Sequence, residues 1–254
     1  TSITAYKILQ GGPAADLFKK VIKDVLAFTL IGLLGVAGAG HMHAQYLKEV
    51  QPMKLSAMEA LWETEDPAPF AAFAIINEDK MQNDFEITIP AMFSFMVYNT
   101  PAGEIKGIRD LQEEAVAMYG SDNYVPNVTA LFWAFRIMVG AGGLMILITG
   151  AALLLAMRGK LADKRCMLKV LLYSLPLPFI ANSVGWFVTE SGRQPWIVVG
   201  LQKTVDAVSP NLTTTDLWLT IIGFTLIYLV LIVFAMGVAI RFIKSSPAPE
   251  RSAA

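Results

Sequence analysis

Lys54 and Glu59 stand among apolar side chains in the segment 51–64, which reads QPMKLSAMEALWET. Pro52 suits the first turn of a helix, where the missing N–H has no partner to lose. The apolar side chains recur at spacings of three and four, which predicts one apolar stripe formed by Leu55, Met58 and Trp62. An ammonium and a carboxylate beside apolar groups suit an amphipathic, proton-releasing ligand such as a quinol. The same pattern is also typical of a short surface helix with two solvated charges, which is the commoner case.

A thioether and a carboxylate occur later in the chain at places where they could bind a haem iron. Met138 lies near the outer end of an apolar stretch, and a thioether is a soft iron ligand that raises the reduction potential when it pairs with histidine. A methionine in such a stretch more often only packs. Arg136 lies in the same stretch, and a guanidinium inside a membrane helix requires a partner. Glu190 ends another apolar stretch, where an acidic residue is commonly a solvated cap.

His41 and His43 are the only histidines, so a metal or haem role has to be considered for them. Side chains two residues apart point to different sides of a helix. We therefore favour an interfacial or loop role over ligation. The single cysteine, Cys166, excludes an internal disulfide and any cluster of cysteine ligands.

The composition predicts a membrane protein: 55% of the residues are hydrophobic, and uncharged apolar runs of about 20 residues match the hydrocarbon core of a bilayer. The formal net charge of −1 gives no indication of nucleic-acid binding. No signal peptide is visible at the start of the sequence. Four complete spans are expected, at about 18–42, 129–157, 169–189 and 216–240. Pro176 and Pro178 should kink the third span.

The regions between the spans differ in charge. Residues 41–128 form a large extramembrane region with 14 Asp and Glu against 5 Lys and Arg. Its segment 89–97 is apolar but too short to cross a membrane, so it is expected to pack against the protein or to re-enter the membrane. The segment 105–119 is expected to form an amphipathic helix with Asp110, Glu113 and Glu114 facing water. Basic residues in 19–23, 158–165 and 241–244 predict that these segments share the cytoplasmic side. The acidic region and the loop 190–214 then lie on the opposite side.

Four stretches together resemble the large subunit (subunit I) of cytochrome bd ubiquinol oxidases, in its C-terminal half. Segment 51–64 is similar to the quinol-binding loop (Q-loop) of that family. The others, in the family's order, are FRIMV at 135–139, LPLP at 175–178 followed by GWF at 185–187, and ESGRQPW at 190–196. The resemblance runs from about residue 5 to about residue 243, and Ile3–Leu9 looks like the end of a further span.

The resemblance implies the fold, the cofactors and the roles of seven residues. The expected fold class is an all-α membrane protein with four full spans and an N-terminal helix remnant. Its expected parts are 1–42 with the first span, 43–128 as the Q-loop region, 129–243 as the haem-binding membrane part, and 244–254 as a disordered tail. The expected localisation is the prokaryotic inner membrane, with the Q-loop outside.

In the Q-loop, the resemblance implies that Glu59 accepts a quinol proton and that Lys54 donates a hydrogen bond to a quinol oxygen. Met138 corresponds to an axial ligand of the low-spin haem b558. Arg136 lies about 200° from Met138 around the helix. It is therefore expected to reach a propionate or another helix instead of the iron.

The last motif implies ligands for a second haem. Glu190 corresponds to the ligand of the high-spin haem b595, and Arg193 is suited to a haem propionate. Trp196 is expected either between haem edges or in an interfacial belt of aromatic residues.

The chain departs from the family in one respect. Family subunits have about nine spans, and their first half supplies the histidine ligands of haem b558 and haem d. We therefore expect a partner chain with these histidines, alongside the second oxidase subunit. The expected function is part of a quinol:oxygen oxidoreductase; the alternative is a non-catalytic membrane scaffold or transporter-like subunit without haems.

Overall fold

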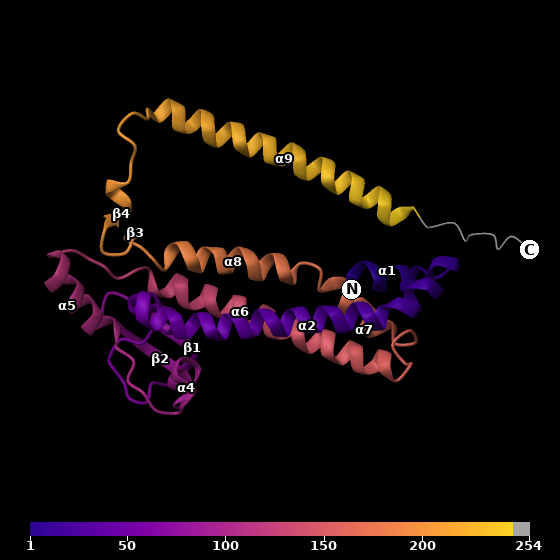
Figure 1. Cartoon of the computed structure of the whole chain (residues 1–254), viewed down its shortest axis with the longest axis horizontal. Helices are drawn as coiled ribbons and strands as arrows, with labels where there is room; N and C mark the ends of the chain where they lie inside the picture. The colour runs from indigo at the N-terminus through magenta and orange to yellow at the C-terminus, as the bar shows by residue number, and fades with distance from the viewer. Residues whose placement is uncertain (246–254) are drawn as a thin grey trace, which may run out of the picture. The chain divides into compact units, whose positions relative to one another are not determined.

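The computed structural model describes residues 1–245, except the side chains of Pro13 and Ala14, and these residues are mostly helical (Figure 1). Four helical stretches are long and apolar enough to cross a membrane, and the expected all-α membrane fold with four full spans is confirmed. The helices that form these stretches are α2 (Pro13–Val50), α6 (Val128–Met157), α7 (Arg165–Tyr173) with α8 (Leu177–Ser191), and α9 (Thr214–Lys244). A short helix, α1 (Ser2–Gln10), precedes them where the helix remnant was expected.

The membrane-length helices differ from the predicted spans at their ends. Helix α2 has 38 residues, or about 57 Å at 1.5 Å per residue, and therefore extends past the predicted end near residue 42 to Val50. The third span is interrupted at 174–176 between α7 and α8. This break agrees with the effect expected of Pro176 and Pro178, which lack the N–H that continues a helix. Helix α9 has no buried residue within this chain, as expected of an apolar helix that faces lipid or another protein.

The chain packs into two compact units. Unit 1 comprises 1–28, 149–174 and 208–254, and unit 2 comprises 29–148 and 175–207. In unit 1, α1 packs on α7, and the Ser2 hydroxyl donates a hydrogen bond to the Leu171 carbonyl at 2.8 Å. The three basic segments belong to unit 1, whereas the acidic region falls almost entirely in unit 2. The predicted tail begins at Lys244, which ends α9, and 246–254 lie outside the described residues.

Unit 2 holds the extramembrane region, which contains strands that the sequence analysis did not predict. Its elements are α3 (Pro52–Glu59), β1 (Phe70–Asn77), β2 (Gln82–Ile89), α4 (Met92–Tyr98) and α5 (Ile108–Tyr119). Strands β1 and β2 form an antiparallel hairpin whose register shifts twice. A second hairpin, β3 (Trp196–Val198) with β4 (Gln202–Lys203), follows α8 and leads into a short 3-10 turn, η1 (Thr204–Asp206). Segment 89–97, expected to pack or re-enter, contains the end of β2 and most of α4, whose Phe93 and Val97 are buried.

Helix α5 is amphipathic, as predicted for the segment 105–119. Ile108 and Leu111 are buried, and the three acidic side chains, Asp110, Glu113 and Glu114, are exposed. Met118, in the last turn of the helix, is 71% exposed.

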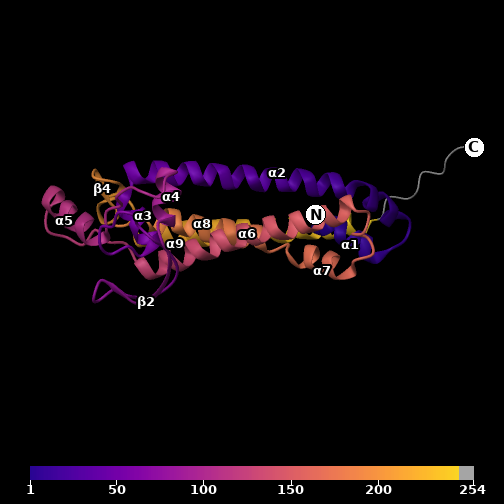
Figure 2. The same cartoon turned by 90° about the horizontal axis from the view of Figure 1, so that it is seen from below.

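The core of unit 2 surrounds α3. Helix α3, helix α4 and the β1–β2 hairpin gather around the first turns of α6 (Figure 1 and Figure 2). Buried side chains from these elements form one continuous cluster that includes Leu55, Met58, Trp62, Phe93 and Phe132. The segment with the candidate quinol-binding residues is therefore the centre of this unit.

Candidate functional site

Helix α3 is buried on all sides, which excludes the surface-helix interpretation. Every residue from Lys54 to Glu59 is buried. Pro52 occupies the first turn, as predicted, and Ala60 ends the helix in a left-handed conformation. The Ser56 hydroxyl donates a hydrogen bond to the Lys106 carbonyl at 2.7 Å, so the helix is fixed to the segment before α5. Two charged side chains are thus held in an apolar core, where each requires a partner.

Glu59 has its partner on α6. Arg136 Nη2 lies 2.6 Å from Glu59 Oε2, and Nη1 lies 3.1 Å from Oε1, which gives a two-point ion pair. The exposed fractions of the two side chains are 11% for Arg136 and 3% for Glu59. Sequence reasoning named both residues but did not pair them. They lie 77 positions apart, and only the fold brings them together.

The other hydrogen bonds of Arg136 use the remaining N–H donors of its guanidinium. Nη1 donates to the Met58 carbonyl at 2.6 Å, and Nε donates to the Ala71 carbonyl at 3.1 Å. Nη2 also donates to Ala71, so all five N–H groups have acceptors. The guanidinium carbon lies 3.9 Å from the centre of the Phe132 ring. Of the two expected alternatives, a haem propionate or another helix, the structure has the second.

The environment of Glu59 changes its acidity. Burial raises the pKa of Glu59 to about 7, although the Arg136 charge acts in the opposite direction. The residue also lines a pocket of about 410 Å³, whose other walls include Trp62, Asn83 and Glu86. A carboxyl group with a pKa near neutrality beside an open pocket can exchange a proton at physiological pH.

Lys54 points to a different part of the site from Glu59. They lie five positions apart along α3, which places their side chains about 140° apart around the helix. The Lys54 ammonium donates to the Thr189 carbonyl on α8 at 3.3 Å. Burial lowers the pKa of Lys54, the Arg193 charge lowers it further, and the Glu190 charge acts in the opposite direction. Lys54 is therefore adjacent to the ESGRQPW motif.

Glu190 and Arg193 form an ion pair three residues apart at the end of α8. Both side chains remain partly accessible, with exposed fractions of 38% for Glu190 and 34% for Arg193. The buried Nε of Arg193 has no hydrogen-bond partner. A buried N–H without an acceptor is costly, so an additional anion or polar group would be favourable at this position.

Met138 faces α8 from α6. A Cβ atom built on Gly185 would lie 2.9 Å from the Met138 sulfur, which shows that the thioether lies directly against this glycine. The side chain is half-buried. The FRIMV and GWF motifs, separated in sequence, thus meet at this contact.

Trp196 belongs to an aromatic cluster that the sequence analysis did not identify. Its ring stacks on Tyr124, with centroids 5.6 Å apart and 12° between the planes, and meets Tyr119 edge-on at 5.0 Å. The Lys203 ammonium lies over Tyr124 at 4.9 Å and is paired with Asp122 at 2.5 Å. The tyrosines precede α6 and the tryptophan follows α8, so no local spacing in the sequence could have indicated the cluster.

The two histidines lie on exposed positions of α2. A ring nitrogen of His41 is 2.7 Å from the Asn99 side-chain oxygen, and His43 packs near Tyr46. Both are outside the contacts described above. Within residues 1–245, no group of three or more His, Cys, Asp or Glu side chains is arranged to hold a metal ion.

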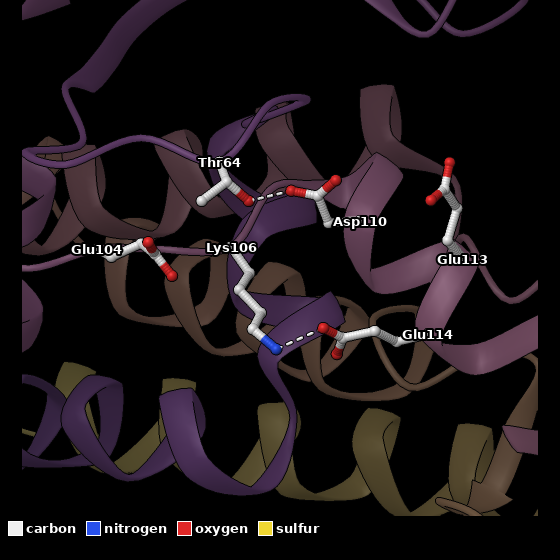
Figure 3. A pocket seen from close by; sticks show the side chains of 6 residues that line it. All are labelled: Thr64, Glu104, Lys106, Asp110, Glu113 and Glu114. Atoms are coloured by element: carbon white, nitrogen blue, oxygen red, sulfur yellow. Dashed lines mark hydrogen bonds and ion pairs between the residues drawn. The ribbon is translucent and has the colours of Figure 1, made fainter. Parts of the chain in front are cut away.

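A second pocket lies on the surface of unit 2, beside α5. Figure 3 shows its lining, where Lys106 pairs with Glu114 at 2.5 Å and Thr64 donates a hydrogen bond to Asp110. Glu104 and Glu113, on opposite sides of the view in Figure 3, complete the lining. All four acidic side chains are exposed, so this pocket lacks the desolvated environment of Glu59.

The whole chain matches a known family. A family model described as "Cytochrome bd terminal oxidase subunit I" matches residues 1–247. The chain belongs to this family. It is 41% identical over 243 residues to cytochrome bd ubiquinol oxidase subunit 1 of Bacillus subtilis, covering 95% of this chain and 52% of that protein.

Other proteins of the cytochrome bd family also match this chain over almost all of its length. Over 257 residues the chain is 30% identical to a putative cytochrome bd menaquinol oxidase subunit I of Bacillus subtilis, covering 98% of this chain and 54% of that protein. The bd oxidase structure from Geobacillus thermodenitrificans aligns with a TM-score of 0.81 at 27% identity, covering 97% of this chain and 54% of that one. The chain therefore spans about half the length of the relatives that it matches. The family and the four apolar helices identify a multi-pass protein of the bacterial inner membrane.

In this cytochrome bd chain, replacing Arg136 should destabilise unit 2. Arg136→Met leaves the Glu59 carboxylate buried without its cation, and breaking a buried pair in this way costs about 3–5 kcal/mol. We expect a lower unfolding temperature of the assembled protein, measured by thermal denaturation in detergent. The double variant Arg136→Met/Glu59→Met removes both charges and should recover much of the loss. Equal stability of the single variant and the unsubstituted protein would show that the ion pair is unimportant for the fold.

Proposed function

We propose that this chain is part of a bd-type quinol:oxygen oxidoreductase and oxidises quinol in the region around α3. The observation that carries the proposal is Glu59, a buried carboxyl group with a pKa of about 7 that lines a 410 Å³ pocket. Oxidation of a quinol releases two protons and two electrons, and a base must accept each proton. Glu59 is suited to accept one of them because its pKa is close to the operating pH.

Arg136 and Lys54 have separate supporting roles in this proposal. Arg136 holds the Glu59 carboxylate in one orientation and stabilises it when it is ionised. Lys54 uses one of its three N–H groups for the Thr189 carbonyl, which leaves donors for a quinol oxygen. Because the two side chains diverge around α3 and Lys54 does not line the pocket beside Glu59, this pocket supports the role of Glu59 alone.

The donor side chains of the membrane part fit two haems. In this proposal Met138 would hold the iron of haem b558 through its thioether, and Glu190 would hold the iron of haem b595 through its carboxylate. The unpartnered buried Nε of Arg193 supports a propionate as its additional partner. Trp196, in its stacked cluster, would pack near the haem edges. When bound, haems at these donors would supply the one-electron redox chemistry that links quinol oxidation to the reduction of oxygen at haem d.

The imidazole ligands would come from outside the 254 residues of this sequence. The only two histidines lie exposed on α2, away from Met138 and Glu190 in the contacts that the structure describes. We propose that the part of the large subunit that corresponds to its N-terminal half supplies them, next to the second oxidase subunit. The acidic Q-loop region would lie on the outer side, where it releases the quinol protons.

The test is an absorbance spectrum of the complex purified through this chain, together with quinol-dependent oxygen consumption. We expect reduced bands of b- and d-type haems and oxygen uptake that requires quinol. A complex without haem bands would contradict the proposal and favour the scaffold alternative.

A further inference from the structure

Helix α8 lacks a side chain at the point where the Met138 thioether contacts it. A Cβ added at Gly185 would lie 2.9 Å from the Met138 sulfur and 3.6 Å from its Cγ. The first distance is shorter than real Cβ contacts, so the sulfur can keep its present position only if residue 185 is glycine.

Backbone conformation does not explain this glycine. Gly185 lies inside α8 and is not among the glycines with positive φ. Glycine in a helix interior is less favourable than alanine by about 0.5–1 kcal/mol. Glycine at position 185 is therefore unfavourable for the helix itself, and the close contact with Met138 explains why a glycine is present there.

The glycines of α6 provide the contrast. Around Gly140, Gly142, Gly143 and Gly150, a Cβ would meet nothing within 4 Å in this chain. Gly185 differs from them because a donor side chain from another helix fills the space that its own side chain would take.

We propose that Gly185 is a positioning residue for the Met138 thioether: the missing side chain on α8 sets where the sulfur lies and hence how it meets the haem iron. This inference rests on the proposed function, in which Met138 is an axial ligand. A methionine side chain has three rotatable bonds and yields easily. A methyl group at position 185 should therefore displace the sulfur while the backbones of α6 and α8 remain in place.

A displaced thioether is a weaker ligand. Because a methionine ligand raises the reduction potential of haem iron, weakening it should lower that potential and convert part of the haem from low spin to high spin. Haem content should not change, since the other donors are untouched. These two changes distinguish a positioning role from a merely structural one.

The experiment uses Gly185→Ala in the assembled oxidase, with a redox titration followed by absorbance. We expect a lower midpoint potential for the low-spin haem and partial loss of its band. Gly140→Ala is the matched control, because it adds the same methyl group on α6 two residues from Met138, at a position without neighbours in this chain. It should leave the potential unchanged.

The yield of the assembled complex is a second measurement that tests the role of Gly185. If Gly185→Ala lowers the yield of the complex, the variant Gly185→Ala/Met138→Ala should restore it, because the shorter side chain leaves room for the methyl group. If Met138→Ala alone assembles normally but the double variant does not, another contact requires the glycine, and the inference is overturned.

The outcomes separate this inference from the proposed function. An unchanged potential and spectrum in Gly185→Ala, with the band lost in Met138→Leu, would overturn the role of Gly185 and leave the ligand assignment intact. A band that survives Met138→Leu would contradict the ligand assignment itself, and the inference would fail with it.

Discussion

Met138→Leu is expected to abolish the absorbance band of the low-spin haem in the assembled oxidase. Leucine has nearly the volume of methionine, so packing against Gly185 and the stability of α6 should change little. It offers no sulfur lone pair, so the iron loses one axial ligand and becomes high spin. Electron transfer from quinol should fall with it. The measurement is the reduced-minus-oxidised spectrum, together with total haem determined chemically.

Met145→Leu provides the control for this substitution. Met145 lies on the same helix, two turns further along and on nearly the same face as Met138. It makes the same chemical change without removing a proposed ligand, so its spectrum should equal that of the unsubstituted protein. A normal low-spin band in Met138→Leu would refute the ligand assignment, whereas loss of the band in both variants would indicate a general packing effect.

The membrane helices were predictable from the sequence because each depends on local composition. A run of about 20 apolar residues has few alternatives to a membrane helix, and Pro176 with Pro178 breaks the third helix for a local steric reason. The β1–β2 hairpin was missed. Its two register shifts interrupt the alternation of buried and exposed residues by which a strand is recognised.

The candidate site residues could be predicted from the sequence, but their ion-pair and hydrogen-bond partners could not. Arg136 required an anion, and nothing in its neighbourhood along the chain indicated Glu59, 77 residues away. Lys54 and Thr189 are 135 residues apart, and their contact appears only when α3 is enclosed by the core of unit 2. Long-range pairing depends on how elements pack, which a linear pattern of residue types does not record. The assignments of individual residues to haem and quinol stay predictions.

Glu59→Gln is expected to slow quinol oxidation on the order of 100-fold or more, which is the usual contribution of a general base. Glutamine keeps the size of the side chain and can still accept a hydrogen bond from Arg136, whose guanidinium also keeps the Met58 and Ala71 carbonyls as acceptors. The variant should therefore still fold, although the buried guanidinium loses its anion and the stability of unit 2 falls. It cannot take up a proton, so the quinol must release its proton to a weaker acceptor. Haem content and spectra should remain unchanged, because Glu59 is not a proposed ligand.

The pH dependence of turnover tests the role of Glu59 more specifically than the rate at a single pH. Glu59 must be ionised to accept a proton, and with a pKa of about 7 its ionised fraction falls as the pH drops below that value. Turnover of the unsubstituted oxidase should therefore fall toward acidic pH with the slope of a single protonation. In Glu59→Gln this fall should be absent and the low rate nearly independent of pH.

Glu113→Gln is the matched control, since it makes the same change at an exposed carboxylate of the acidic surface pocket shown in Figure 3. Its rate and its pH profile should equal those of the unsubstituted oxidase, measured as quinol-dependent oxygen uptake in membranes between about pH 5.5 and 8.5. If Glu59→Gln also retains normal turnover and the acidic fall, the proton acceptor must be a different group. In that case the buried pair of Glu59 and Arg136 would serve only to hold α3 against α6.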